Sequence, residues 1–176
     1  MKKFELTSEF ITNIFGTKLF RIKALIEFGN VKAGELGGFT EKEENLSQDG
    51  NAWVYDNARV YGDACVCGDA RVCDNARVYG NAWVYGDACV CGDACVYGDA
   101  CVYGDAGYAT VHGFGSEYRT TTFFKTKAGD IGVKCGCFYG NLSEFRKKVV
   151  ETHGETKKAK EYLMLADLME FRLTHK

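Results

Sequence analysis

With 176 residues and 46% hydrophobic content, the chain has the size and composition of one compact unit with appendages. It contains no run of about 20 apolar residues, and no apolar segment follows its N-terminal MKKFELTSEF, which argues against a membrane span and a signal peptide. We therefore expect a cytoplasmic protein without a membrane partner. The formal net charge is only −2, and no DNA or RNA partner is expected.

Residues 1–50 are expected to form N-terminal strands and a capping coil. The segments KFELT and TKLFRIKALI show partial strand alternation, which predicts an extended hairpin over residues 1–30. Residues 31–50 contain Gly34, Gly37 and Gly38 before Phe39, a composition that suits an irregular opening coil. Such a coil would cover the first edge of whatever follows it.

Residues 51–106 repeat the same pattern every six residues. Alanine occupies every sixth position from 52 to 106, and valine every sixth position from 54 to 102. In each Ala-x-Val triplet, strand alternation turns Ala and Val to one side and the middle residue to the other. Three units make one coil of 18 residues, and coils stack about 4.8 Å apart. The repeat therefore predicts a β-solenoid with valines inside.

The outward positions of these coils form columns. A rise of 18 residues aligns Arg59 with Arg77, and Tyr61 with Tyr79 beside them. Arginines next to tyrosines could bind a phosphate and a base. They could equally form a surface where subunits meet, and the two interpretations agree if a ligand lies between subunits. With Trp53 and Trp83 also expected to point outward, we predict a homo-oligomer, with a trimer as first choice.

Seven of the nine cysteines lie in the repeat, in positions otherwise held by Tyr, Arg or Trp. Without an export signal they are interpreted as reduced, small apolar surface residues. The repeat contains no CxxC pair and no histidine, so we expect no metal and no cofactor.

Residues 107–176 are expected to form a C-terminal α+β module. Strands are predicted over 118–126 and 130–138, around the turn KAGD. A helix is predicted over 141–153, because Asn141 and Glu144 form a capping box and Gly154 stops it. A second helix, over 156–173, places six side chains on one face: Ala159, Tyr162, Leu163, Ala166, Met169 and Leu173.

The C-terminal part is also where an anionic partner is expected, since it carries 12 basic and 8 acidic residues. One polar stretch combines the cations Arg119 and Lys125 with the hydroxyls of Thr120 and Thr122. Guanidinium, ammonium and hydroxyl groups together suit an anion. A threonine-rich strand on an exposed sheet face is the alternative.

The Val and Ala positions, from Val54 with Ala58 to Val102 with Ala106, resemble the aliphatic and small positions of the hexapeptide-repeat family. This resemblance implies a left-handed parallel β-helix, mainly β in class. The flanking segments, LFRIKALIEFGNVKAGELGGF and FFKTKAGDIGVKCGCFYGNL, resemble phage and prophage proteins usually labelled transferases. If the chain is phage-encoded, its location would be the host cytoplasm.

Transferases of the hexapeptide class use a histidine on a loop that projects from the coils. This chain has neither a loop insertion nor a histidine between 51 and 106. His112, just beyond the coils, is the candidate general base. Cys135 with His153 is a candidate thiol nucleophile and base, although C-x-C on a strand turns both sulfurs to one face, which favours packing. We therefore lean toward a protein that is not an enzyme.

The leading hypothesis is non-catalytic binding and sequestration of a small anionic, nucleotide-derived signalling molecule at subunit interfaces, as in a phage counter-defence sponge. One alternative is an acyl- or nucleotidyl-transferase, and the other is a structural or protein-interaction module. The residues expected to line the binding site are Arg59, Arg77, Tyr61, Tyr79, Arg119, Thr120, Thr122 and Lys125.

Overall fold

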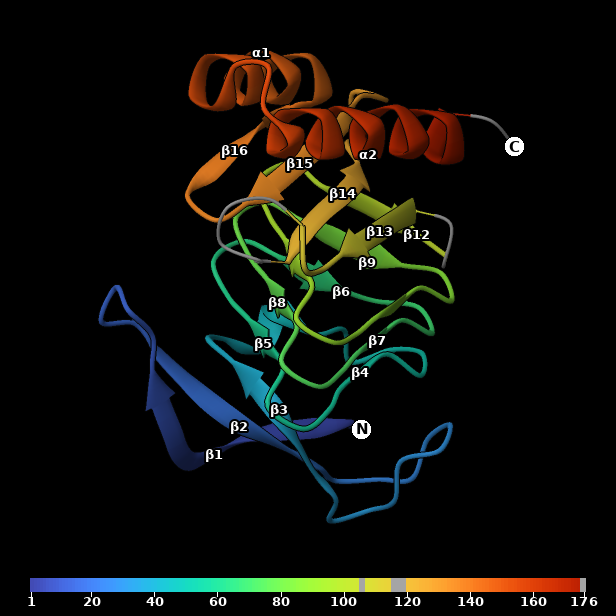
Figure 1. Ribbon diagram of the computed structural model, residues 1–176. Helices are drawn as coiled ribbons and strands as arrows, with labels where there is room; N and C mark the ends of the chain where they lie inside the picture. Colours follow the sequence, from blue (N-terminus) through green and yellow to red (C-terminus); the bar gives the residue numbers. More distant parts are fainter. Residues whose placement is uncertain (105–106, 115–119, 175–176) are drawn as a thin grey trace.

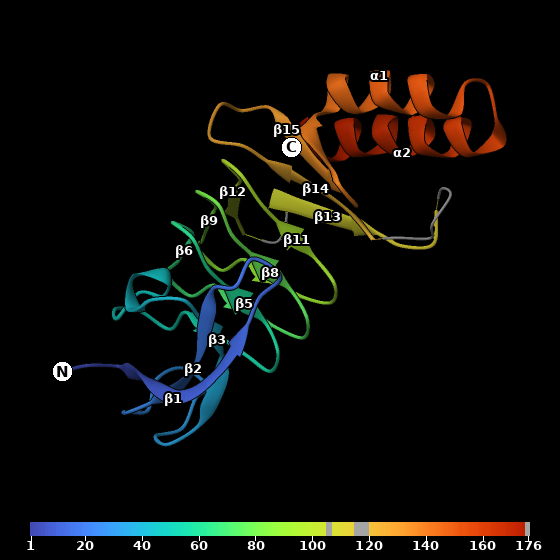
Figure 2. The same cartoon turned by 90° about the vertical axis from the view of Figure 1, so that its left-hand side faces the viewer.

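A computed structural model describes residues 1–104, 107–114 and 120–174. The molecule is a stack: N-terminal strands lie at one end, the coils follow, and two helices lie at the other end (Figures 1 and 2). The predicted β-solenoid is confirmed. The division of the chain at residues 50 and 106 stays a prediction.

Nine short strands build the solenoid, and they form three parallel sheets. The orders of these nine strands are β5-β8-β11, β4-β7-β10 and β6-β9-β12. Paired residues on neighbouring strands are 18 positions apart in the sequence, so Val54 pairs with Val72 and Val60 with Val78. The strands are β4 (Trp53–Val54), β5 (Arg59–Val60), β6 (Cys65–Val66), β7 (Arg71–Val72), β8 (Arg77–Val78), β9 (Trp83–Tyr85), β10 (Cys89–Val90), β11 (Cys95–Val96) and β12 (Cys101–Tyr103).

The repeat alanines and valines fill the interior. Each alanine from Ala52 to Ala100 and each valine from Val54 to Val102 is at most 1% exposed. The corners need a positive φ, which most repeats supply with glycine. Asp56 and Asp74 take that place in two repeats, at φ 51° and 58°. Aspartate tolerates this conformation better than most residues, which explains why the period continues without an insertion.

The N-terminal strands continue one face of the solenoid. An antiparallel hairpin of β1 (Phe4–Thr12) and β2 (Lys18–Ala24) pairs with β3 (Leu36–Thr40), and β3 pairs in parallel with β5. The predicted hairpin is therefore present. The opening coil is more regular than expected, because it contains β3 and the short 3-10 helix η1 (Glu43–Asn45).

Trp53 corrects one prediction, because its side chain lies inside the protein. It is fully buried, and the rings of Phe4 and Phe28 pack edge-on against it with centroids 6.2 and 5.3 Å away. The N-terminal segment covers this face of the first coil. The Trp53 side chain, which points outward from the coil, is therefore buried beneath that segment. Trp83, one coil later on another face, is 49% exposed, as predicted.

Lys3 joins the N-terminal strand to the start of the first coil by hydrogen bonds. It is 2% exposed, and its ammonium donates to three backbone carbonyl oxygens between residues 49 and 52, the shortest bond being 3.0 Å to Ala52. Burial lowers the pKa of Lys3 from 10.5 to about 8, against the opposing effect of the Asp49 carboxylate.

A pH-dependent contribution to stability follows. Between pH 8 and 10.5 the folded protein gives up the Lys3 proton while the unfolded chain keeps it, so stability due to this group rises with pH. We expect the unfolding free energy of wild type, minus that of Lys3→Met, to increase across this window; one pKa unit corresponds to about 1.4 kcal/mol. Urea titrations at several pH values measure it, and a difference that stays flat would contradict the assignment.

The C-terminal module adds a four-stranded antiparallel sheet and a helical pair. The strands are β13 (Tyr108–Val111), β14 (Thr121–Lys125), β15 (Ile131–Cys135) and β16 (Phe138–Asn141), in that order. The helices are α1 (Leu142–His153) and α2 (Lys157–Thr174). Of the strands, β14 and β15 were predicted and β13 and β16 were not. None of the described helices is long and apolar enough to cross a lipid bilayer.

The helix predictions are confirmed in position and largely in packing. The Asn141 side chain accepts from the Glu144 backbone, and the Glu144 carboxylate accepts from the Asn141 backbone, which is the predicted capping box. On α2 the buried face includes Leu165 in place of the predicted Leu163, which lies at the edge of that face.

Candidate anion-binding groove

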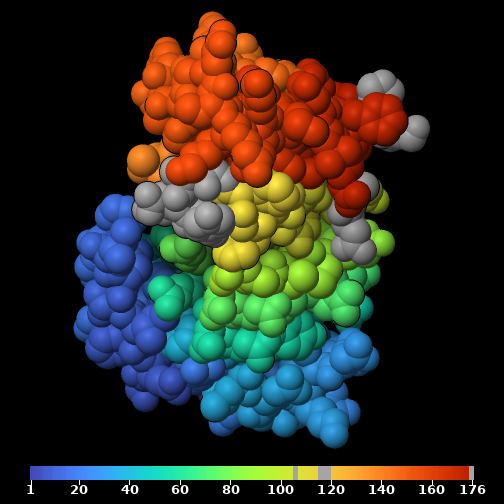
Figure 3. Space-filling view, in the orientation of Figure 1, coloured from blue at the N-terminus to red at the C-terminus, as the bar shows by residue number. Residues whose placement is uncertain are grey.

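A groove of 620 Å³ lies between the tip of the β1–β2 hairpin and the coil face formed by β5 and β8. In Figure 3 the hairpin, in blue, stands beside the green coils with a hollow between them. We call this hollow the Arg–Tyr groove. Its lining residues are Asn13, Ile14, Phe15, Arg59, Tyr61, Arg77, Tyr79, Asp93, Cys95, Thr120, Lys134, Gly136 and Cys137.

Two arginines stand one above the other in this groove. Arg59 on β5 is in register with Arg77 on β8, and strands in this ladder are about 4.8 Å apart. Neither guanidinium forms an ion pair with any residue that the structure describes. Lys134 adds a third cation to the lining, against the single carboxylate of Asp93. The groove is therefore positive although the chain as a whole is slightly acidic.

The predicted tyrosine ladder is present beside the arginines. The rings of Tyr61 and Tyr79 are stacked, with centroids 4.8 Å apart and planes 9° apart. Tyr97 continues the ladder at 4.4 Å, and Tyr139 closes it edge-on. Because these rings cover one another's faces, no base can insert between them. The ladder instead offers ring edges and hydroxyl groups.

Burial favours the neutral form of the Tyr61 and Tyr79 phenols. It raises the pKa of Tyr61 to about 12 and raises the pKa of Tyr79 further, with a contribution from the Cys95 thiol, whose sulfur lies 3.4 Å from the Tyr79 hydroxyl. Both hydroxyls thus remain hydrogen-bond donors at any physiological pH. They can approach an anion without like-charge repulsion.

The structure brings together five of the eight predicted binding residues, namely Arg59, Arg77, Tyr61, Tyr79 and Thr120. Two of the other predicted residues do not line this groove. Thr122 is fully buried, and its hydroxyl accepts a hydrogen bond from the Cys95 backbone N–H, so it joins β14 to the last coil. Lys125 lies at the far end of β14 and does not line the groove. Arg119 lies outside the described residues.

Sequence reasoning missed the hairpin tip. Asn13, Ile14 and Phe15 form one wall of the groove, and Ile14 and Phe15 are 92% and 73% exposed. Apolar residues at the tip of a hairpin, where polar turn residues are usual, were the available signal.

Two of the candidate catalytic residues, Cys135 and His153, line one pocket of 280 Å³ next to α1, and His112 lies elsewhere in the C-terminal module. His112 is exposed, and its Nδ1 lies 3.1 Å from the hydroxyl of Thr120, which lines the groove. Cys135 accepts a hydrogen bond from the Thr121 hydroxyl, and the His153 ring stacks on Tyr162. The contacts of Cys135 and His153 are typical of side chains that pack in a protein core.

The C-x-C segment differs from its prediction. Cys135 ends β15, but Gly136 turns the chain at φ 57° and leaves Cys137 exposed. Cys135 packs against the core under the helices, as expected, whereas Cys137 is exposed because the strand ends between the two residues. Both cysteines line the pocket of 280 Å³ next to α1.

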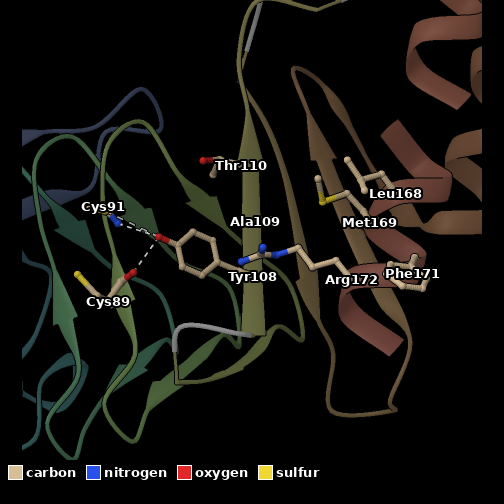
Figure 4. Close-up of a pocket in the computed structure, with 9 residues that line it drawn as sticks. All are labelled: Cys89, Cys91, Tyr108, Ala109, Thr110, Leu168, Met169, Phe171 and Arg172. Atoms are coloured by element: carbon tan, nitrogen blue, oxygen red, sulfur yellow. Dashed lines mark hydrogen bonds between the residues drawn. The ribbon is translucent and has the colours of Figure 1, made fainter. Parts of the chain in front are cut away.

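A second groove, of 870 Å³, separates the coils from helix α2, and we call it the helix groove (Figure 4). Tyr108 spans it from β13: its hydroxyl donates to the Cys89 carbonyl at 2.8 Å and accepts from the Cys91 N–H at 3.2 Å. Arg172 is the one cation among its described lining residues. With three cations, the Arg–Tyr groove is the better site for an anion.

Comparisons with known proteins agree with the coil architecture. A family model described as "YdcK Beta solenoid repeat" matches residues 52–68 and 70–86. The chain is also similar to a protein of Escherichia coli (strain K12) named "Uncharacterized acetyltransferase YdcK", at 40% identity over 63 residues. This match covers 32% of the chain and 19% of the relative, so the chain spans only a small part of that protein's length.

Proposed function

For this hexapeptide-repeat β-helix protein, we propose that the Arg–Tyr groove binds a small anionic, nucleotide-like molecule without converting it. The interior of the coils is filled by valine and alanine, so contact with other molecules falls to the outward side chains. The predicted trimer, and the sequestration of a defence signal, stay predictions.

The register of Arg59 and Arg77 is the observation that carries the proposal. Two cations at the spacing of neighbouring strands repel each other unless an anion or solvent compensates. A phosphate that bridges both guanidinium groups would remove that repulsion and gain charge-assisted hydrogen bonds. Lys134, which also lines the groove, can neutralise a second negative group.

The rest of the groove suits the non-phosphate part of such a ligand. The Tyr61 and Tyr79 hydroxyls and Thr120 can bind sugar hydroxyls. Ile14 and Phe15 give the opposite wall an apolar surface on which a base can pack. The volume of 620 Å³ lies within the range of small-molecule sites.

Removing the arginine pair tests the proposal. In calorimetric titrations with cyclic AMP, ADP-ribose and pyrophosphate as probes, we expect wild type to bind at least one of them. Arg59→Ala/Arg77→Ala should bind it about 100-fold more weakly, since each charged hydrogen bond contributes about 1.5–3 kcal/mol. Arg71→Ala is the matched control, because Arg71 occupies the same repeat position on another face. No binding by wild type, or equal losses in both variants, would contradict the proposal.

Acyl transfer is the second candidate, favoured by the word acetyltransferase in the name of the relative and by the position of His112 beside Thr120. Incubation with acetyl-CoA or the bound nucleotide, followed by mass spectrometry, separates the two. Recovery of unmodified ligand indicates binding alone. Conversion that is lost in His112→Asn indicates an enzyme.

A further inference from the structure

Three thiols meet on the coil face next to the helix groove. Cys89 and Cys91 flank Val90 at the end of strand β10, where the alternation of the extended chain turns both to the same side. Cys73 comes from the preceding coil, where its N–H donates to the Val90 carbonyl, and it stacks against Cys91. The three sulfur atoms all lie within 4.8 Å of one another.

These separations match the requirement of one metal ion bound by three thiolates. With metal–sulfur bonds of about 2.3 Å, a trigonal arrangement places the sulfurs about 4.0 Å apart. The upper limit of 4.8 Å on the observed separations is close to this value. No described histidine or carboxylate belongs to the cluster, so its donors are sulfur alone.

The surroundings suit thiolates. Arg71 is in register with Cys89 and places a positive charge beside the cluster. The Tyr108 hydroxyl lies 3.9 Å from the Cys91 sulfur, on the side of the helix groove. Cys73 and Cys89 are half-buried, whereas Cys91 is exposed, which leaves a path for an ion to enter.

We propose that Cys73, Cys89 and Cys91 form a binding site for one soft, thiophilic metal ion of the Zn(II) or Cu(I) class. Each thiol loses its proton to solvent as its sulfur–metal bond forms, and no electron is transferred. Because thiolates rather than thiols bind the metal, binding should release protons to the solvent.

A second copy of the same local sequence serves as a control for the metal site. The sequence DACVCG occurs at 63–68 as well as at 87–92. Around the first copy, the next coil supplies Trp83 and Tyr85 in register with Cys65 and Cys67, so no third thiol completes the cluster there. The two copies have the same local sequence and differ in the residues of the neighbouring coil that lie beside them.

The test uses the full chain, freed of metal and kept reduced, with Zn(II) and Cu(I) added in separate titrations. Native mass spectrometry should show one tightly bound ion of at least one metal, and a weakly buffered titration should show the proton release. Cys73→Ser should weaken that binding at least 100-fold. Cys65→Ser/Cys67→Ser should leave it unchanged.

The outcomes decide the proposal. Failure of wild type to bind either ion at micromolar concentration overturns it, as does binding that survives in Cys73→Ser. An equal loss in Cys65→Ser/Cys67→Ser would assign the ion to scattered thiols. Thermal unfolding of the metal-free variants confirms that each is folded, and Cys91→Ser repeats the test from the exposed side of the cluster.

Discussion

Trp53→Ala is expected to lower the free energy of unfolding by about 3–5 kcal/mol, the range found when a large aromatic side chain is removed from a core. The Trp53 side chain is fully buried and lies between the first coil and the N-terminal cap. Phe4 and Phe28 pack against its ring from the cap. Its removal leaves a cavity and separates the two parts that it joins. Equilibrium unfolding in urea measures the loss.

Trp83→Ala is the matched control, because NAWVY surrounds both tryptophans. Trp83 is 49% exposed and packs against Lys127, so its loss should cost about 1 kcal/mol. Trp53→Phe should also be mild, since it keeps most of the volume and removes an indole N–H without a hydrogen-bond partner among the described residues. Similar costs for Trp53→Ala and Trp83→Ala would show that the cap does not cover Trp53 in solution.

Gly38→Ala should destabilise the protein by about 3 kcal/mol or more, above the usual cost of overpacking. An added Cβ would lie 2.6 Å from the Ala58 carbonyl oxygen and 2.9 Å from that of Tyr55. Both neighbours are backbone atoms of the first coil, which cannot rotate away. The parallel pairing of β3 with β5 would have to open, and with it the junction between cap and solenoid.

Gly34→Ala provides the comparison within the same cap. Gly34 has a φ of +87°, but an added Cβ there meets no atom within 4 Å. The expected cost is the backbone strain alone, about 1 kcal/mol. Thermal unfolding of both variants shows which is less stable. A Gly38→Ala protein as stable as Gly34→Ala would mean that β3 does not pair with β5 in solution.

The repeat was predictable because its period is a local property. Once Ala and Val recur every six residues, a stack with 18-residue coils is the arrangement that buries all of them. The same arithmetic placed Arg59 beside Arg77 and Tyr61 beside Tyr79, so half of the Arg–Tyr groove followed from the repeat alone.

The other half of the groove was not predictable in this way. Ile14 and Phe15 are distant in sequence, and a hairpin must fold back along the coils to bring them there. Thr122 lies away from the groove for the complementary reason: its hydroxyl accepts a hydrogen bond from a backbone N–H on the last coil, a contact set by docking of the C-terminal sheet. Non-repeating segments carry no period that would reveal such contacts.

The sequence by itself determined the coil, its valine core and the columns of like residues, because these depend on chemistry within 18 residues of each position. Only the tertiary structure decided which outward positions stay exposed, since a column is covered or free according to what packs on it. Trp53 lies under the cap while Trp83 meets solvent. Likewise, DACVCG gains a third sulfur at one copy and aromatic neighbours at the other.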